Sequence, residues 1–276
     1  MEINICHGLT LSSVIYNSST PATSTHFQLK RVGESKSGAV VTKSCTVVPI
    51  TPSSDFKRYE YDTETQTSYN RNGLINKGVD YFLSYTPQVD KPYILSFYPI
   101  QWEDIKYIAC HEEINRITSV ELNISCPNIN AINSGSLKKI VRKAALLPIP
   151  VGIKVAPSRG LTDVHLMVNL LRENSHIKYI VCGNTLTDQT SPKGFIGAMG
   201  GKKIKQLTMW NVKHYCRLLD IPVIACGGVS CGRDVIDYLH AGATAVQIGT
   251  CFYQEGEICF SRILSEMEEC TTTSKL

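Results

Sequence analysis

Eight short apolar segments alternate with stretches of helical spacing along the whole sequence. Little alternation of apolar and polar residues occurs within them, which is typical of parallel strands that are covered on both faces. Eight such strands separated by helices predict a single-domain (β/α)8 barrel, a TIM barrel, over residues 1–276, with a doubly wound sheet as the alternative. The segments are residues 13–18, 38–44, 93–99, 119–125, 151–156, 179–184, 222–228 and 245–250.

Two of the connecting stretches have a clear helical pattern. After residue 160, the apolar side chains of Leu161, Val164 and Leu171 fall on one face, and Thr162 is a candidate cap at the start. The stretch that begins at residue 232 has the same amphipathic pattern, and Gly242 stands where a helix would stop. Both stretches support alternation of strands and helices.

The composition excludes several classes of function. The chain is 43% hydrophobic, and its net charge of +4 is too small to indicate a nucleic-acid or membrane partner. The cysteines are eleven, an odd number, and are scattered singly, so we expect reduced thiols of an intracellular protein. The seven histidines lack metal-site spacing, so no catalytic metal is expected.

The localisation signals are mixed. No apolar run approaches the roughly 20 residues needed to cross a bilayer, and the amino end lacks a basic region followed by an apolar block. We therefore expect a soluble cytosolic protein. The chain ends in Ser-Lys-Leu, a peroxisomal address, so import into peroxisomes or glycosomes is the alternative.

Glycines follow the last two predicted strands, where a barrel of this kind commonly binds phosphate. Gly227 and Gly228 end the seventh strand, and Gly249 and Thr250 end the eighth. Glycines let backbone N–H groups approach a dianion closely. One such turn is commonly no more than a tight connection, but two adjacent turns at the predicted strands favour an anion site.

The other strand ends carry polar side chains. A buried lysine is costly unless an anion or dense hydrogen bonding meets it, although a lysine at a strand end can also extend to water. Two lysines, several amides and a thiol beside a phosphate site are hard to explain by packing alone. These residues are Lys43 and Ser44 after the second strand, Asn123, Ser125 and Cys126 after the fourth, Lys154 in the fifth, and Asn184 and Thr185 after the sixth.

The segment "ELNISCPN", residues 121–128, holds an isolated cysteine before a proline, flanked by asparagines. A cysteine spaced for a metal or a disulfide has partners nearby, and Cys126 has none in the surrounding sequence. The flanking amides indicate a planar, polar ligand held close to a thiol.

Together with "TKSCT", "NRNGLINKGVDYFLSY" (70–85), "VGIKVAP", "CGN" and "GGVSCGRDVIDYLHAGATAVQIGT", this segment resembles dihydroorotate dehydrogenase of class 1, and class 1A most closely. The likeness extends from about residue 8 to residue 268. It implies a homodimeric FMN enzyme that oxidises dihydroorotate to orotate in pyrimidine biosynthesis, with fumarate as the electron acceptor.

The resemblance also assigns catalytic and substrate-binding residues. Cys126 would remove the C5 proton of dihydroorotate while a hydride leaves C6 for the flavin, with Lys43 and Ser125 beside it. A free thiol has a pKa of about 8.5, so this base needs a lowered pKa or a proton relay. The substrate would be held by Lys43, Asn70, Asn123, Asn128, Asn184 and Thr185, with backbone groups of Gly73 and Leu74.

The flavin set follows from the same resemblance. Lys154 and Lys43 would face the flavin, where a positive charge favours the anionic reduced form. Gly227, Gly228, Gly249 and Thr250 would bind the phosphate of FMN. The remaining cofactor residues would be Ser18, Ser19, Ser44, Asn123 and Gly200.

Departures from the family pattern gather around the substrate. Thr20 replaces a usual glycine, Asn72 a usual methionine and Ile75 a usual proline, and Arg58 stands near the end of an altered motif. The segment after the cysteine, "INAINSGS", is also changed. Two alternatives therefore remain: a diverged flavin oxidoreductase with another dihydropyrimidine-like substrate, and a non-enzymatic descendant that keeps the barrel.

Overall fold

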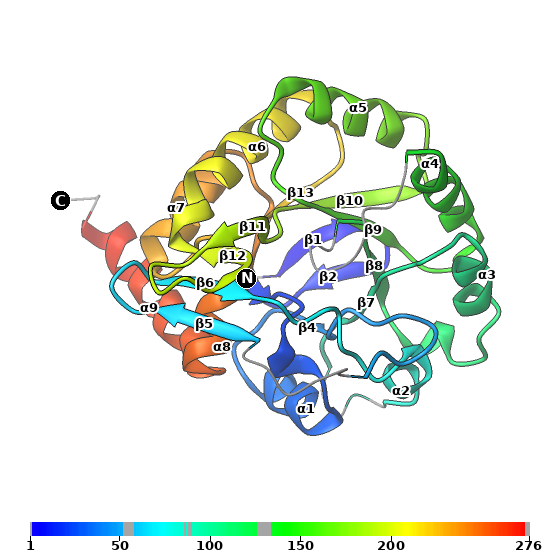
Figure 1. Cartoon of the computed structure of the whole chain (residues 1–276), viewed down its shortest axis with the longest axis horizontal. Helices are drawn as coiled ribbons and strands as arrows, with labels where there is room; N and C mark the ends of the chain where they lie inside the picture. Colours follow the sequence, from blue (N-terminus) through cyan, green and yellow to red (C-terminus); the bar gives the residue numbers. More distant parts are fainter. Residues whose placement is uncertain (1, 52–57, 86, 88–89, 126–133, 274–276) are drawn as a thin grey trace.

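Eight parallel strands form the central sheet of the chain in a computed structural model that describes residues 2–51, 58–85, 87, 90–125 and 134–273. The sheet order is β3-β14-β13-β10-β9-β8-β7-β4, and Figure 1 shows helices around its outer side. Every strand overlaps one predicted segment, so the (β/α)8 prediction is confirmed. The strands are β3 (Ile15–Asn17), β4 (Val40–Val41), β7 (Tyr93–Phe97), β8 (Ser119–Asn123), β9 (Val151–Val155), β10 (Ile177–Cys182), β13 (Val223–Cys226) and β14 (Ala245–Ile248).

The helices pack on the strands through a continuous apolar core. Short 3-10 turns lie at residues 21–23, 114–116, 144–146 and 202–204. Within the part of the chain that the structure describes, no helix is both long and apolar enough to cross a membrane. The helices are α1 (His26–Glu34), α2 (Val79–Leu83), α3 (Glu103–Ala109), α4 (Ser134–Lys143), α5 (Leu161–Arg172), α6 (Lys205–Leu218), α7 (Gly232–His240), α8 (Thr250–Glu255) and α9 (Ile258–Thr273).

The two helices predicted in detail are present. Helix α7 ends at His240, two residues before Gly242, whose φ of +103° suits glycine. Helix α5 differs at its start, because its N-cap is Gly160 and no side chain caps it. The predicted cap at Thr162 is therefore wrong, and Leu161 is 49% exposed in the first turn instead of packing on the core.

A hairpin that the sequence did not predict closes the amino-terminal end of the barrel. Its strands are β1 (Ile3–Cys6) and β2 (Leu9–Leu11), which pair antiparallel. Their apolar side chains join a cluster inside the barrel that includes Tyr16, Tyr179 and Ile224. The hairpin thus fills the end of the barrel opposite to the ends that carry the predicted site.

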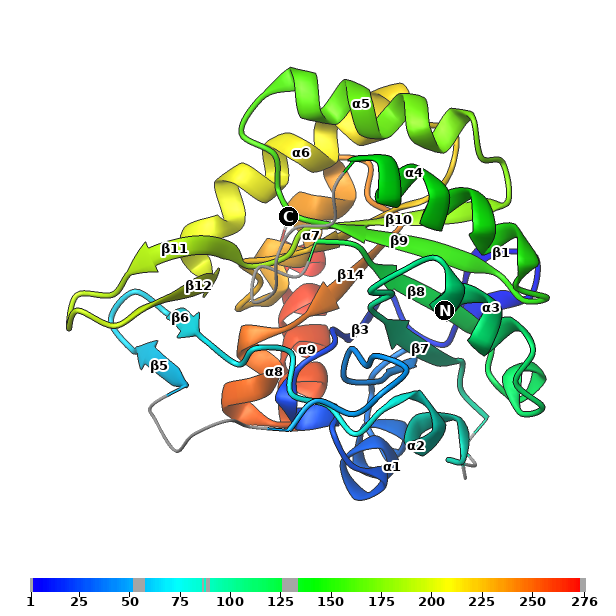
Figure 2. The ribbon, with the colours of Figure 1, turned by 45° about the vertical axis from the view of Figure 1, so that its right-hand side comes forward.

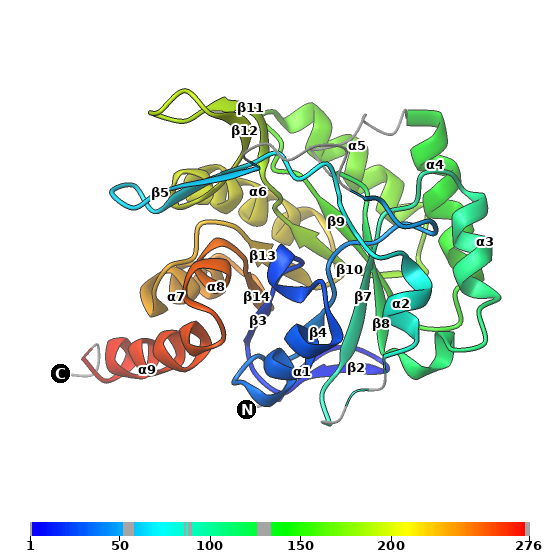
Figure 3. The same ribbon diagram turned by 60° about the horizontal axis from the view of Figure 1, so that its bottom comes forward.

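A second unpredicted element stands at the other end, as Figures 2 and 3 show. It is a four-stranded antiparallel sheet in the order β11-β12-β6-β5. Strands β5 (Tyr59–Asp62) and β6 (Thr67–Asn70) follow β4, whereas β11 (Leu186–Thr190) and β12 (Ile196–Gly201) follow β10. Two excursions far apart in the sequence therefore join into one wall beside the carboxyl ends of the barrel strands.

The barrel closes between β3 and β4, the outermost strands of the central sheet. Backbone bonds there run from Ser12 N to Gly38 O (3.0 Å) and from Gly38 N to Ile15 O (2.8 Å). A Cβ at Gly38 would lie 2.3 Å from the carbonyl oxygen of Ser13, so only glycine permits this close approach.

Candidate functional site

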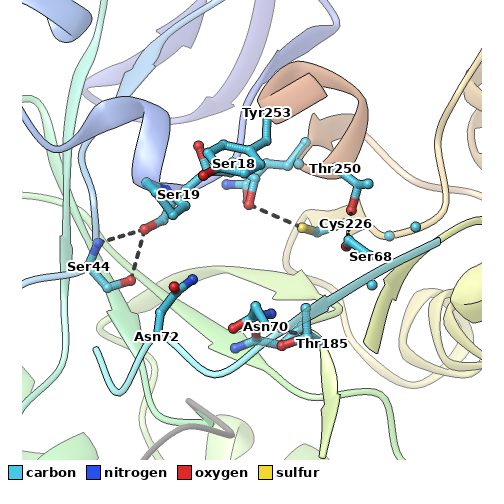
Figure 4. A pocket seen from close by; sticks show the side chains of 18 of the residues that line it. Ser18, Ser19, Ser44, Ser68, Asn70, Asn72, Thr185, Cys226, Thr250 and Tyr253 are labelled. Atoms are coloured by element: carbon cyan, nitrogen blue, oxygen red, sulfur yellow. Dashed lines mark hydrogen bonds between the residues drawn. The ribbon is translucent and has the colours of Figure 1, made fainter. Parts of the chain in front are cut away.

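A cavity opens at the carboxyl ends of the barrel strands. Its lining comes from the strand ends, from the β5–β6 and β11–β12 excursions, and from the start of α8 (Figure 4). Most of the predicted site residues meet here. They are Ser18, Ser19, Lys43, Ser44, Asn70, Leu74, Asn123, Lys154, Asn184, Thr185, Gly200, Gly227, Gly228, Gly249 and Thr250.

One wall of the cavity is a chain of hydrogen-bonded amides and hydroxyls. The Nδ2 of Asn184 donates to Asn123 Oδ1 (3.1 Å), and Asn123 Nδ2 donates to Ser44 Oγ (3.0 Å). Ser44 continues the chain, because its N–H donates to Ser19 Oγ (2.6 Å) and its hydroxyl lies 2.8 Å from Ser96 Oγ. These bonds fix the orientation of each amide, so the wall presents a defined pattern of donors and acceptors to a ligand.

The floor of the cavity carries a buried ammonium group. Lys154 is 3% exposed, and its Nζ donates to Ser18 Oγ (2.9 Å) and to Gln247 Oε1 (2.9 Å). Burial by itself would lower the pKa of Lys154, but its electrostatic and hydrogen-bond interactions with Cys226 and Glu121 outweigh this effect, so the pKa is raised. The floor therefore presents a fixed positive charge.

Another side of the cavity is lined by glycines. A Cβ at Gly228, whose φ is +72°, would come within 2.5 Å of the Lys205 side chain. A Cβ at Gly200 would meet Ser68 Oγ at 3.0 Å and Thr250 Oγ1 at 3.2 Å, and those two hydroxyls lie 3.0 Å apart. Both glycines line the cavity, as the prediction of an anion site requires.

The loop between β6 and α2 borders the cavity in an unusual backbone conformation. Gly73 (φ +60°) and Leu74 (φ +57°) are both left-handed, which is uncommon for leucine. The buried Asn76 holds the loop by donating to Leu74 O (2.8 Å) and accepting from the N–H groups of Thr46 and Gly78. Leu74 lines the cavity, whereas Gly73 is exposed beside it.

The remaining predicted residues belong to the segment after β8. Ser125 is half-buried outside the lining, with its Oγ 3.3 Å from Lys154 O and its carbonyl accepting from Asn184 Nδ2 (3.2 Å). Cys126 and Asn128 lie outside the described residues. Their predicted roles therefore stay predictions from the sequence.

Several lining residues were missed. Tyr59 of β5 and Tyr253 of α8 meet edge to face at the cavity, with ring centroids 4.9 Å apart, and Ser68 lies on β6. No sequence signal indicated that these segments would meet. Gln247 was detectable, because it is a polar residue within the apolar segment "AVQIGT", and so was Glu121 in "SVELNIS".

Two departures from the family pattern also reach the cavity. Thr20 and Asn72 both line it, and the side chain of Asn72 makes no hydrogen bond with any described residue. Within the same part of the chain, no group of three or more His, Cys, Asp and Glu residues is placed to hold a metal ion. The site thus offers ammonium groups, amides, hydroxyls and open backbone, which suit an anionic ligand and a planar polar one.

Comparison with known proteins agrees with this geometry. The family profile described as dihydroorotate dehydrogenase matches residues 1–271. The dihydroorotate dehydrogenase (fumarate) of Trypanosoma brucei brucei is 29% identical over 298 residues, covering 99% of this chain and 94% of that protein. The enzyme of the same description from Trypanosoma cruzi is 30% identical over 272 residues, covering 89% of this chain and 85% of that protein.

A solved structure agrees in fold. The crystal structure of the ligand-free type DHODH from Eimeria tenella superposes with a TM-score of 0.84 at 16% identity, covering 99% of this chain and 88% of that chain. At that identity the likeness concerns the fold alone.

Proposed function

The chain belongs to the dihydroorotate dehydrogenase family, and on that premise we propose that it is a flavoenzyme that uses FMN to oxidise dihydroorotate to orotate, with fumarate as the electron acceptor. The observation that carries the proposal is the meeting of Lys43, Lys154, a wall of amides and a side of glycines in one cavity. The lysines suit anionic groups, the amides suit a pyrimidine ring, and the glycines suit the phosphate of the flavin.

The cavity suits FMN in shape and charge. Gly228 and Gly249 line the side assigned to the phosphate, and a Cβ at Gly249 would lie 3.7 Å from the Cβ of Ser18, another lining residue. Lys154 would lie against the ring system, where its charge favours an anionic reduced flavin. Bound there, FMN would supply a two-electron acceptor.

The amide wall suits a pyrimidine. Asn123 and Asn184 offer donors and acceptors that match the alternating N–H and C=O groups of the ring, and Asn70, at the end of β6, lines the same cavity. Lys43 would pair with the substrate carboxylate. Cys126, by the family resemblance, would take the C5 proton, so that one proton and one hydride leave the substrate together. Fumarate would receive the same two electrons and two protons.

Reduction of the bound flavin tests the proposal. The purified protein should be yellow, and anaerobic dihydroorotate should bleach it while orotate forms. Added fumarate should restore the colour. A yellow protein that is not bleached by dihydroorotate would contradict the proposed substrate. A colourless protein that takes up no FMN would contradict the proposed cofactor.

A different dihydropyrimidine is the second candidate substrate. Asn72 favours it, because this side chain places an additional free amide at the cavity where the family usually has a thioether. Anaerobic screening of dihydropyrimidines against the oxidised flavin separates the two candidates, since only the true substrate should bleach it rapidly.

We also propose a homodimer in the cytosol. The four-stranded sheet supports association, because β5 and β11 are its outermost strands in the part of the chain that the structure describes (Figure 2). Light scattering on the purified protein tests the dimer. The final Ser-Lys-Leu lies outside the described residues, and imaging of fusions with a free and a blocked carboxyl terminus tests the location.

A further inference from the structure

A fully buried carboxylate lies beneath the cavity floor. Glu121 is 0% exposed in the middle of β8 and pairs with Gly152 of β9. Side chains alternate along a strand, so Glu121 points the same way as Asn123, which lines the cavity and pairs with Lys154. Glu121 therefore lies one layer below the ligand, where it cannot serve as a direct contact.

Gln247 of β14 connects this carboxylate to the floor. Its Nε2 donates to Glu121 Oε2 (2.6 Å) and lies 3.3 Å from the hydroxyl of Tyr16, while its Oε1 accepts from Lys154 Nζ (2.9 Å). Both ends of the amide are thus engaged: the donor end faces the carboxylate, and the acceptor end faces the ammonium. The bond to the carboxylate therefore fixes the Gln247 amide in the orientation that turns its oxygen toward Lys154.

The two charges also depend on each other directly. Glu121 Oε1 has no hydrogen-bond partner within the described part of the chain, and it lies 3.6 Å from Lys154 Nζ. A buried charge is costly unless an opposite charge lies close by, and removal of one partner leaves the other uncompensated. The other groups placed against the ammonium are Ser18, Gln247 and Cys226, of which only the thiol can ionise.

We propose that Glu121 is a positioning residue of the flavin site, which holds the Lys154 ammonium charged and in place at the cavity floor through Gln247. The inference rests on the proposed function, because Lys154 is assigned to the flavin there. Without the carboxylate, the ammonium keeps neutral hydrogen-bond acceptors and loses its proton more readily. The flavin then meets a floor whose charge varies with pH.

The test is the proton count of flavin reduction in Glu121→Gln holoenzyme. Midpoint potentials are measured by spectroelectrochemical titration from about pH 6 to about pH 9, a range that lies below the ordinary pKa of Lys, about 10.4. In the parent enzyme, Lys154 stays charged, and reduction to the anionic form takes up one proton per two electrons. In the variant, reduction should also draw a proton onto Lys154, so the count should approach two at the upper end. The dissociation constant of FMN for the apoprotein should rise by about tenfold or more.

Two controls separate positioning from general damage. In a Lys154→Met background, Glu121→Gln should not change the proton count further, because the titrating group is gone. Asp104→Asn removes another buried carboxylate, which accepts from Ile100 N (2.7 Å) and Gln101 N (3.1 Å) in the turn before α3, outside the cavity. It should lower thermal stability and leave the proton count unchanged.

The outcomes are distinct. A folded Glu121→Gln protein with the parent's proton count and FMN affinity would overturn the inference. If that variant does not fold, Gln247→Met decides, since it removes the bridge that positions the ammonium while Glu121 stays 3.6 Å from it. The dissociation constant of FMN should then rise as in Glu121→Gln, and an unchanged FMN affinity there would overturn the inference equally. A parent protein that takes up no flavin would instead refute the proposed function.

Discussion

The side-chain amide of Asn17 takes the place of a strand partner for Val41. Its Nδ2 donates to Val41 O (2.7 Å) and its Oδ1 accepts from Val41 N (2.9 Å), so a residue of β3 satisfies both backbone groups of a residue in β4. Both residues are 0% exposed. The barrel is thus closed beside Ser18 and Ser19 by a side chain, at the point where the ladder of backbone bonds ends.

Asn17→Ala should destabilise the protein strongly. It leaves the N–H and C=O of Val41 buried without partners, and each such group costs about 1–3 kcal/mol, so the free energy of unfolding should fall by about 2–6 kcal/mol. Urea denaturation followed by circular dichroism measures it. Asn169→Ala, at an exposed position of α5, is the matched control and should change the value by less than about 0.5 kcal/mol. An equally small effect at Asn17 would show that water or a shifted backbone closes the barrel.

The strands of this barrel were predictable because their apolar runs are continuous, as in "YILSF" and "VGIKV". The four-stranded sheet was not, since β5, β6 and β11 are short and polar, and its two hairpins pair with each other across a long separation in sequence. Tyr69, for example, pairs with Met199. Such pairing leaves no local periodicity to detect.

Gly200→Ala should weaken FMN binding. The new Cβ would lie 3.0 Å from Ser68 Oγ and from Thr185 Cγ2, so these side chains must move toward the cavity or the bond from Ser68 to Thr250 must lengthen. We expect the dissociation constant of FMN to rise by about tenfold, the equivalent of one lost hydrogen bond or a small steric clash. Fluorescence titration of the apoprotein measures it.

Gly160→Ala is the control for that change. Nothing lies within 4 Å of a Cβ there, and the φ of −149° is open to alanine. Its FMN affinity should equal that of the parent. Equal affinity in the Gly200 variant as well would remove that residue from the flavin set.

Stability should depend on pH through Asp234. Burial alone would raise the pKa of Asp234, but hydrogen bonds from Lys205 and from the backbone of Ser230 outweigh it, so the pKa is lowered. A carboxyl group with a lowered folded-state pKa stabilises the protein above its unfolded pKa of about 3.9 and loses this contribution as the pH falls through the folded value. Asp234 binds the backbone that follows Gly228, so this charge also supports the glycine side of the cavity.

Asp234→Asn should therefore lower the free energy of unfolding by about 1–3 kcal/mol at neutral pH. The difference from the parent should shrink as the pH falls below about 4, because the parent carboxyl then becomes neutral as well. Denaturation curves across this pH range measure it, with Asp220→Asn at an exposed turn as the control. A difference that stays constant with pH would mean that the charge of Asp234 contributes nothing.

Cys126→Ala should retain the flavin and lose its reduction by substrate. Removal of a general base commonly slows a step by about 10²-fold or more, so stopped-flow reduction near neutral pH should slow accordingly, while the flavin spectrum stays normal. Cys110→Ala, an exposed thiol at the end of α3, should reduce at the parent rate. Equal rates for the Cys126 variant and the parent would exclude the thiol from the reaction.

The charged residues of the candidate site were predictable from the sequence, because a charged side chain in a buried strand needs a partner. Lys154 stood out because an ammonium inside "VGIKV" needs a partner, and the structure supplies Ser18 and Gln247. The same rule applied to "SVELNIS" would have identified Glu121. Tyr59 and Tyr253 could not be identified, because their contact exists only where the unpredicted sheet reaches α8.

Asn72 should govern how tightly the substrate is held. Its side chain lines the cavity without a hydrogen bond to any described residue, so it is free to bond a pyrimidine edge. Loss of one such bond costs about 0.5–1.5 kcal/mol, so Asn72→Ala should raise the KM for dihydroorotate by about 2- to 12-fold with little change in FMN affinity. Asn72→Met restores the family's usual side chain and separates shape from hydrogen bonding. If the amide bonds the substrate, alanine and methionine should weaken binding alike. If the Asn72→Met variant instead binds dihydroorotate more tightly than the parent does, Asn72 adapts the cavity to a different dihydropyrimidine. Steady-state kinetics with both substrates would then show that the variant prefers dihydroorotate and the parent prefers the other compound.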